Sequence, residues 1–312
     1  MMLAFFAAAT IAQAQTGPGL VLRPWPDGKS VEVAADAMFL GSATTDNAAA
    51  DIHLRRYDVG GRYRSDQSAA PLFSFGVDVT YLDVATSDPA LPDSLVDQSV
   101  AAGVALGETG GWAFDVIVGF GYAGDNPYGD DTALYAIADV IARHRVDDRS
   151  SWHVLLDYNG NRTFLPDVPL PGFGYHHRSS DVFSYTLGLP HSGFDWRPAD
   201  RVSLSVGYVV PVTFRAVAAY EVTDGVSVFG QFDNRLDAFT LDSTRDHRRL
   251  FFQQRRIEAG VRVRPHDMVD ITLAGGYAFD QEFESGFDTR DRDGVADVSD
   301  EPFIRAALNL RF

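Results

Sequence analysis

The chain has 312 residues, a formal net charge of −17 and no cysteine. The length allows one large closed sheet without division into domains, and the missing cysteine excludes disulfides, thiolate metal sites and a cysteine nucleophile. The negative charge argues against nucleic acid as a partner, whose phosphates would be repelled, and the sequence lacks the run of about 18 apolar residues that a transmembrane helix needs.

The first residues have the pattern of an export signal. A short apolar segment is followed by Ala12-Gln13-Ala14, the small-residue spacing of a signal-peptide cleavage site. We expect a signal peptide over residues 1–14, cleaved near Ala14/Gln15, and a periplasmic segment over residues 15–30. No Lys or Arg precedes the apolar segment, and the alternative is a buried N-terminal helix, which the glycines and prolines that follow disfavour.

Bulky apolar residues alternate with small or polar residues along most of the chain. The clearest stretch runs from Trp112 to Tyr122, with Asp115, Gly119 and Gly121 between its bulky residues. Successive side chains of a β-strand point to opposite faces, so this stretch is predicted to be a strand with one bulky and one small face. Its length matches the roughly 9–11 residues of a membrane-spanning strand, whose lipid face carries aromatics at both ends. The same pattern predicts strands at 31–41, 72–83, 151–159, 181–189, 202–210, 214–221, 257–263, 269–279 and 303–312.

The connections distinguish a barrel from a soluble sandwich. Short links at 108–111, 146–150, 223–225 and 265–268 tend to alternate with long ones at 83–95, 124–131, 160–180, 237–247 and 281–301. Short turns on one side and long loops on the other are typical of membrane barrels. We predict an all-β fold over residues 31–312, a closed antiparallel transmembrane β-barrel of about 14 strands, or 12 if the weak strand at 31–41 is absent. The junction Val210-Pro211-Val212 departs from this rule, because it is short where a long loop is expected.

The last strand carries the most specific signal. It ends at Phe312, with Leu308 and Leu310 on the same parity. Here the chain resembles bacterial outer-membrane β-barrel proteins, whose final strand closes the barrel and ends in Phe as the address read by the assembly machinery. The resemblance implies an outer-membrane location, with outer-membrane lipids, the barrel-assembly machinery and periplasmic chaperones as partners. The alternative is a soluble strand that ends in Phe by coincidence.

A narrower resemblance covers roughly residues 157–237. Pro169-Leu170-Pro171-Gly172, Trp196-Arg197-Pro198 and Ala219-Tyr220 are similar in spacing to an uncharacterised family of bacterial outer-membrane barrels. That family has no known activity, so the resemblance implies a fold and no function.

Charged residues on the small-residue parity are expected to face the interior, because an Arg or Lys facing lipid at mid-membrane costs about 2–4 kcal/mol. Acidic residues come mainly from the first half and arginines from the second, which would create acidic and basic walls opposite one another and orient ionic solutes. The alternative is that these charges pair within a filled, closed lumen, and the sequence leaves both open. The predicted lumen-lining charges are Asp78, Asp115, Asp139, Asp157, Arg215, Glu221, Arg256, Glu258, Arg262, Arg305 and Arg311.

Two loop regions carry weaker signals. Around Gly294, the carboxylates of Asp291, Asp293, Asp297 and Asp300 form a weak candidate calcium site. Thr289 stands where an EF-hand needs its first Asp, so a solvated loop is the preferred interpretation. A basic run beside two phenylalanines would grip lipid phosphate or simply form a solvated strand end, and we prefer the latter. The run comprises Arg245, His247, Arg248, Arg249, Arg255 and Arg256, with Phe251 and Phe252.

Ser151 and His153 share the inward parity of one strand, which permits a hydrolase site of the kind that some outer-membrane barrels carry. No Asp or Asn partner is identifiable, and eight histidines make chance proximity common. We therefore predict no enzyme and no cofactor, and instead a porin-like channel for the passive passage of small solutes. The alternatives are a closed structural or lipid-interacting barrel without transport and, third, a barrel-embedded lipid hydrolase. The sequence specifies neither the solute nor the oligomeric state.

Overall fold

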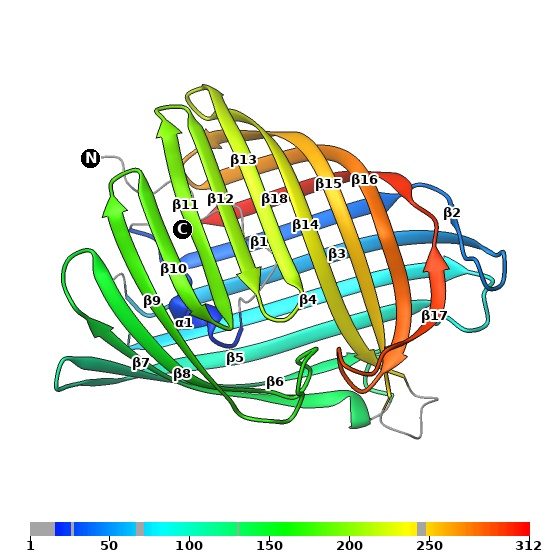
Figure 1. Ribbon diagram of the computed structural model, residues 1–312, viewed down its shortest axis with the longest axis horizontal. Helices are drawn as coiled ribbons and strands as arrows, with labels where there is room; N and C mark the ends of the chain where they lie inside the picture. The colour runs from blue at the N-terminus through cyan, green and yellow to red at the C-terminus, as the bar shows by residue number, and fades with distance from the viewer. Residues whose placement is uncertain (1–15, 26–27, 67–71, 130, 242–247) are drawn as a thin grey trace.

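The computed structural model describes residues 16–25, 28–66, 72–129, 131–241 and 248–312. Its strands form one sheet that closes on itself into a barrel (Figure 1). Within the described residues there are eighteen strands, of which sixteen form the antiparallel barrel and two, β2 and β17, lie outside it.

The elements follow one another mostly as up-and-down hairpins. The first half contains α1 (Gly19–Leu22), β1 (Val31–Leu40), β2 (Ala43–Thr44), β3 (Asp51–Arg64), β4 (Phe73–Thr86), β5 (Ser94–Thr109), β6 (Trp112–Gly124), the 3-10 turn η2 (Asp131–Ala133), β7 (Leu134–Arg145), β8 (Ser150–Asn159) and β9 (Leu170–Ser180). The second half contains β10 (Phe183–Leu189), β11 (His191–Ala199), β12 (Val202–Val209), β13 (Thr213–Thr223), β14 (Val226–Thr240), β15 (Arg249–His266), β16 (Val269–Gly286), β17 (Asp293–Val298) and β18 (Glu301–Arg311).

The barrel closes through its first and last strands. β1 pairs with β18 in an antiparallel register that includes Val33 opposite Leu310. Just beyond β18, the amide of Phe312 donates to the carbonyl of Val31 at 2.9 Å. Closure joins the two edges that an open sheet would leave unpaired.

The strand number corrects the prediction of about 14. The stretch 160–180, expected as a long loop, contains β9, and β11 follows the next strand after a one-residue turn. The alternation in β9 covers only Gly172 to Tyr175, because Pro171 precedes it and the polar run from His176 to Ser180 follows it, so no full-length pattern marks the strand. β1 is fully formed, so the fallback of 12 strands is also wrong.

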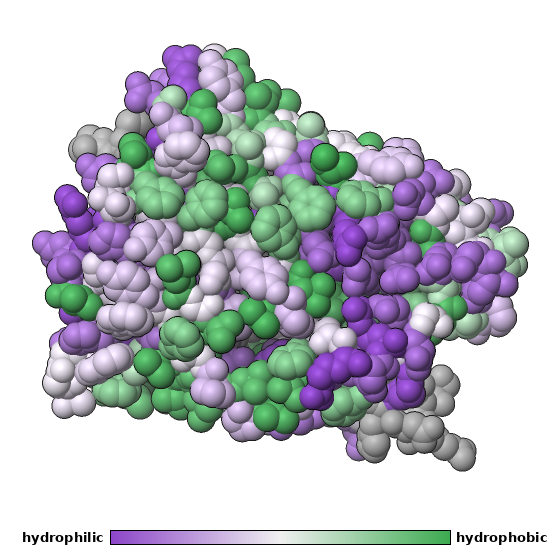
Figure 2. Space-filling model, in the orientation of Figure 1, coloured by the Kyte–Doolittle hydropathy of each residue, from purple (hydrophilic) through white to green (hydrophobic). Residues whose placement is uncertain are grey.

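The outer face of the barrel is apolar and exposed. On β6 and β16, Phe120 is 65% exposed and Leu273 is 62% exposed, whereas the inward Ile117 is fully buried. Figure 2 shows apolar residues, in green, spread over much of the wall, with hydrophilic residues, in purple, gathered near β16 and β17. The alternation along β6 therefore has the two predicted faces, but its inner face is packed rather than wet. Among the described residues, no helix is long and apolar enough to cross a membrane.

The two ends of the barrel differ. One end holds Val31 and Arg311, and we call it the termini end; its strands are joined by tight turns such as 110–111, 224–225 and 267–268. The opposite end, the loop end, carries the connections 87–93, 125–133, 160–169, 241–248 and 287–300. This asymmetry is the one that the spacing of the strands predicts.

Two hairpins stop short of the loop end. β10 and β11 turn at Pro190, and β12 and β13 turn at 210–212 (Figure 1). β14 continues beyond β13, because their pairing ends at Phe214 opposite Asn234 while β14 runs on to Thr240. The wall between β9 and β14 is therefore lower than the rest of the barrel, which explains the short Val210-Pro211-Val212 junction.

Above the short hairpins, walls from opposite sides of the barrel meet. Gly124 at the end of β6 forms a bridge with Thr240 at the end of β14. Nδ2 of Asn161 donates to the carbonyl of Ala238 at 3.1 Å, which covers part of the free edge of β14. A buried apolar core lies between the walls here: Met38, Leu40, Ile52, Leu54, Leu82, Val84, Leu95, Phe239, Leu250, Phe252 and Phe283 are among its members. The loop end is thus packed like a sandwich rather than open.

Candidate functional site

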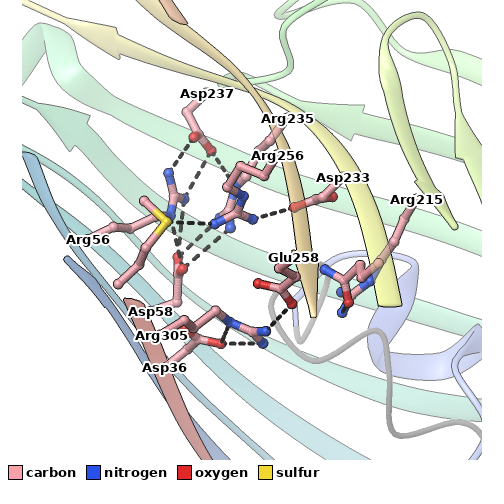
Figure 3. Close-up of polar contacts among 12 residues, drawn as sticks. Asp36, Arg56, Asp58, Arg215, Asp233, Arg235, Asp237, Arg256, Glu258 and Arg305 are labelled. Carbon is pink, nitrogen blue, oxygen red and sulfur yellow. Dashed lines mark hydrogen bonds and ion pairs between the residues drawn. The ribbon is translucent and has the colours of Figure 1, made fainter. Parts of the chain in front are cut away.

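An ion-pair network crosses the interior beside this apolar core (Figure 3). Arg56 on β3 donates from Nη1 to Asp237 on β14 at 2.7 Å and from Nε to Asp58 at 2.9 Å. A second contact between the two strands runs in the opposite direction: Nη2 of Arg235 on β14 donates to Asp58 on β3 at 3.1 Å. Arg56, Asp58 and Arg235 are buried. The two walls are therefore joined by ion pairs, because Arg56 and Arg235 each contact one carboxylate on β3 and one on β14.

The network continues toward β18. Arg256 on β15 pairs with Asp233 on β14. Arg305 on β18 pairs with Asp36 on β1 at 2.8 Å and with Glu258 on β15 at 2.5 Å. Burying a charge costs several kcal/mol, and the cost is offset only where the opposite charge is held at hydrogen-bond distance. The alternation of arginine and carboxylate provides those partners (Figure 3).

A further cluster lies at the termini end. Glu32 on β1 accepts from Arg62 at 2.8 Å and from Arg23 at 3.1 Å. Arg311 pairs with Asp270 at 2.8 Å. This cluster couples the closing seam of the barrel to the N-terminal segment, to which Arg23 belongs.

Residues 16–25 lie inside the barrel, with α1 visible behind the front wall in Figure 1. Leu20 is fully buried in a cluster that includes Ile117 and Leu155 of the inner wall. The guanidinium of Arg62 donates to the carbonyl of Pro24 at 2.7 Å. We expected residues 15–30 to lie in the periplasm; the described part of residues 16–25 instead occupies the interior. Its apolar side chains pack against the inner wall, and this removes apolar surface from water, which is favourable.

The inner face of β9 to β12 differs from the rest of the wall. His176, His191 and Asp195 point inward and remain exposed, and Thr186 is partly exposed. The inward residues of β3, by contrast, are buried from Ile52 to Arg64. The interior is therefore filled beside β3 and open to solvent beside β9 to β12.

The predicted acidic wall consists of inward residues, some of which have local partners. Asp115 pairs with Arg143 at 2.8 Å, and Asp157 pairs with Arg162 at 2.6 Å. Asp139 lies opposite Asp157 on the neighbouring strand, and in the part of the chain that the structure describes neither of its carboxylate oxygens has a hydrogen-bond partner. Asp78 occupies an inward position of β4, opposite Gly60 and Ser99.

The predicted basic wall is likewise mixed in sign. Arg256, Glu258, Arg305 and Arg311 belong to the ion-pair clusters described above. Arg215 donates to Gln231 at 2.7 Å, and the guanidinium of Arg262 lies 5.4 Å from the ring centroid of Phe229. Glu221 is partly exposed on β13. Both halves of the barrel therefore carry both signs, in place of one acidic and one basic wall.

Sequence reasoning missed the residues that cross the interior. Arg56 and Asp58 alternate with Tyr57 and Val59, a period of two that would have placed the two charges inward. Which strand lies opposite them is a property of the closed barrel and leaves no local signal. Arg235 and Asp237 were missed for the same reason.

The candidate calcium residues are dispersed in hydrogen bonds of their own. Asp291 accepts from the amide of Phe287 at 3.0 Å, and Asp293 pairs with Arg248 at 2.7 Å. Asp297 lies on β17, and the carbonyl of Asp300 accepts from the hydroxyl of Tyr277. In the part of the chain that the structure describes, no group of three His, Cys, Asp or Glu residues is placed to hold a metal ion.

The basic run binds other parts of the protein. Arg249 donates to the carbonyls of Phe287 at 2.8 Å and Arg162 at 3.0 Å, which ties two loops to β15. Phe252 stacks on Phe283, with ring centroids 4.6 Å apart, inside the apolar core. Arg255 pairs with Asp280, and Phe251 is buried on the other face of β15. Arg245 and His247 lie outside the described residues, as does the expected signal peptide.

A Ser–His contact exists, but at another place than Ser151 and His153. The ring of His153 lies over Gly174, and a hydroxyl–imidazole contact instead joins Ser150 Oγ to His177 Nδ1 at 2.9 Å. Ser150 is only 5% exposed, and among the described residues His177 makes no hydrogen bond to a carboxylate. A buried hydroxyl whose histidine has no carboxylate to orient it is a poor nucleophile.

Comparisons with known proteins give only distant structural likenesses. No family model matches the chain, and no curated protein matches it. An outer membrane channel from Pseudomonas putida F1 has 11% identity and a TM-score of 0.39, with 93% of this chain and 97% of that chain covered. The P. putida toluene transporter TodX has 9% identity and a TM-score of 0.39, with coverages of 92% and 91%. The translocator domain of the autotransporter NalP from Neisseria meningitidis has 13% identity and a TM-score of 0.30, with coverages of 91% and 89%.

These likenesses are too distant to indicate what this chain transports or binds. The pairing of the strands carries the assignment of the fold. A closed, all-antiparallel barrel with an apolar outer face is the architecture of bacterial outer-membrane β-barrel proteins, as the C-terminal pattern predicts.

Proposed function

We propose that the protein spans a bacterial outer membrane as a porin-like channel for the passive passage of small solutes, and that the arrangement described here is a closed state. The observation that carries the proposal is the exposure of polar residues on the inner faces of β9 and β11. A barrel with a purely structural role would gain most stability from a lumen packed on every side. Here polar groups such as His176, His191 and Asp195 line solvent inside the wall.

The outer face supports the location in a membrane. A soluble protein rarely exposes apolar patches larger than a few hundred Å², because they drive association. On this barrel, large apolar side chains are exposed on many strands, including Phe75, Val118, Leu187, Ile257 and Ile304. Hydrocarbon around the wall would bury this surface.

The N-terminal segment supports the closed state. Residues 16–25 occupy the interior beside β5 to β8, held by the burial of Leu20 and by the hydrogen bonds of Arg62. Movement of this segment would widen the space that already exists beside β9 to β12. We therefore propose it as the gate of the channel.

The experiment is single-channel recording of the refolded mature protein in planar bilayers. The chain has no cysteine, so Leu20→Cys with Ile117→Cys introduces one defined pair, and both positions belong to the same buried cluster. We expect stepwise openings of the reduced variant and their loss on oxidation, with each single-cysteine variant indifferent to oxidant. A heat-modifiable gel shift confirms that each variant is folded. Folded protein that stays silent in every form would contradict the channel.

A closed structural barrel is the second candidate, and the ion-pair network favours it. Arg56, Asp58, Arg235 and Asp237 join opposite walls, as a permanent strut would. This function predicts that weakening the network lowers stability without producing conductance. The same recordings, made on Arg56→Ala, therefore separate the two functions.

The proposed route to the membrane rests on the ends of the chain. Export would require the signal peptide over residues 1–14. Periplasmic chaperones would then deliver the chain to the barrel-assembly machinery, which would recognise Leu308, Leu310 and Phe312. Leu308 is 39% exposed and Phe312 is 53% exposed. Their side chains are therefore accessible to a receptor at the closing seam, and to outer-membrane lipids after insertion.

A further inference from the structure

We propose that the inner face of β9 to β13 contains a binding site for a small oxyanion, such as a phosphate or a carboxylate, in a trough that runs from His176 to Arg215. The proposal rests on the channel function and specifies the class of solute that the channel favours.

The trough follows one continuous row of the sheet. His176 on β9 lies opposite Thr186 on β10, and Thr186 lies opposite Gly193 on β11. Gly193 lies opposite Gly207 on β12, and Gly207 lies opposite Arg215 on β13. Residues in directly opposed positions share a face of the sheet, so all five belong to the inner face. Three strand spacings separate Thr186 from Arg215, roughly 14 Å, which leaves room for a small solute.

Glycines form the floor of the trough. Gly193 and Gly207 place no side chain between Thr186 and Arg215. Among the described residues, a Cβ atom added at Gly207 would have one atom within 4 Å, Nε2 of His191 at 3.9 Å. The imidazole of His191 therefore borders the trough from the neighbouring row. A ligand can lie against the wall here with polar groups on both sides of it.

Arg215 supplies the charge for an anion. Its Nη2 donates to Gln231 at 2.7 Å, while its Nε has no hydrogen-bond partner among the described residues. In Figure 3 it lies beside the ion-pair network, yet no dashed line joins it to Asp233 or Glu258. Arg56, Arg235, Arg256 and Arg305 of the same network each contact a carboxylate. Arg215 is thus a cation that forms no ion pair with a carboxylate among the described residues, and its unpaired Nε is buried.

The remaining groups favour an oxyanion over a neutral or cationic solute. A guanidinium matches the oxygens of phosphate or carboxylate with parallel N–H donors. His191 and the hydroxyl of Thr186, which contacts Nδ1 of His176 at 3.1 Å, add further hydrogen-bonding groups. Asp195 on the next row is exposed and opposes anion binding, so the site holds its ligand weakly. Weak binding suits a channel, because a solute held tightly would not leave.

The test is the binding of inorganic phosphate to the refolded full-length mature protein in detergent, followed by ³¹P NMR. We expect saturable binding, weakened by about tenfold in Arg215→Gln, since a charge-assisted donor is lost. Gly207→Val keeps every charge but fills the floor of the trough, and it should weaken binding similarly. Arg201→Gln, at an exposed turn of the termini end, is the matched control and should bind like the unmodified protein.

Binding and conduction are measured separately, so the two proposals fail separately. If neither Arg215→Gln nor Gly207→Val weakens phosphate binding, the proposed site is wrong, even if the protein conducts. Phosphate binding at Arg215 in a barrel that never conducts overturns the channel and leaves the site. A heat-modifiable gel shift is required of each variant, and the second variant covers the case in which the first does not fold.

Discussion

Arg56 and Asp237 form a 2.7 Å hydrogen-bonded ion pair between β3 and β14, strands that are separated by a large part of the sequence. The pair is shared, since Arg56 also binds Asp58 and Arg235 also binds Asp237. A closed barrel does not require such a strut for its backbone hydrogen bonds. The contact instead fixes how far apart the two walls stand, which determines whether the interior admits a solute.

Removing one member of this strut is expected to destabilise the barrel strongly. Arg56→Ala leaves the largely buried carboxylates of Asp58 and Asp237 with one cation fewer, which costs about 3–5 kcal/mol in the free energy of unfolding. Urea unfolding of the refolded protein, followed by tryptophan fluorescence, measures the loss. Arg201→Ala at an exposed turn is the control and should change stability by less than about 0.5 kcal/mol. A loss below 1 kcal/mol for Arg56→Ala, on the order of a surface pair, would show that the strut is not held in solution.

The bridge between β6 and β14 at the loop end depends on the close approach of Gly124 to Thr240. A Cβ atom there would lie 2.9 Å from the carbonyl oxygen of Thr240 and 3.1 Å from Cβ of Ala133. Gly124→Val should therefore separate β6 from β14 and lower the free energy of unfolding by about 1–3 kcal/mol through overpacking. Gly294→Val meets open space and is the control. Equal stability of the two variants in the same urea experiment would contradict the bridge.

The gate should respond to a charge placed at its buried anchor. Leu20→Asp brings a carboxylate into the cluster that contains Ile117 and Leu155, where it has no water. We expect the N-terminal segment to leave the wall and the open probability in planar bilayers to rise several-fold, with the barrel still folded. Thr223→Asp, an equal charge at the exposed end of β13, should leave the recordings unchanged. Unchanged gating in Leu20→Asp would refute the role of the segment.

Acid should loosen the loops at the loop end. Burial would by itself raise the pKa of Asp288, but hydrogen bonds from Arg290 and from the amide of Leu165 hold this pKa below its usual value. A lowered carboxyl pKa contributes stability above the ordinary value of about 4, and that stability is lost as the pH falls through the lowered pKa. Protection of the Leu165 amide against hydrogen exchange, corrected for the intrinsic rate, should fall below about pH 4. Protection that persists in Asp288→Ala at neutral pH would exclude Asp288 as the cause.

The terminal aromatic should matter for assembly more than for stability. Phe312 is 53% exposed, so Phe312→Ala removes little packing, and the refolded variant should resemble the unmodified protein in urea. In cells, the fraction of heat-modifiable protein in the outer membrane should drop several-fold, because the address of the last strand is lost. Phe173→Ala, on the outer face with 51% exposure, is the matched control. Equal membrane yields of the two variants would contradict the signal.

The period-two pattern predicted the fold well and the strand number less well. Strands with a strong contrast between faces, such as β6 and β18, lie where the alternation places them. β9 and β11 were missed because their alternation is short: a polar run from His176 to Ser180 ends it in β9, and Pro190 and Pro198 bound it in β11, whose inner face, like that of β9, is polar. Those inner faces belong to the part of the wall that stays open to solvent. The strands that are hardest to predict are therefore the ones that carry the proposed site.

The sequence by itself determined that this chain forms a closed β-barrel with an apolar outer face, because residue parity along a strand is a local property of the backbone. It also predicted that charges such as Arg256 and Asp115 point inward. Only the tertiary structure decided that Arg56 meets Asp237, that Gly124 meets Thr240 and that Leu20 lies inside. These contacts join residues far apart in the chain, and they depend on the circumference of the closed barrel and on the heights of its strands.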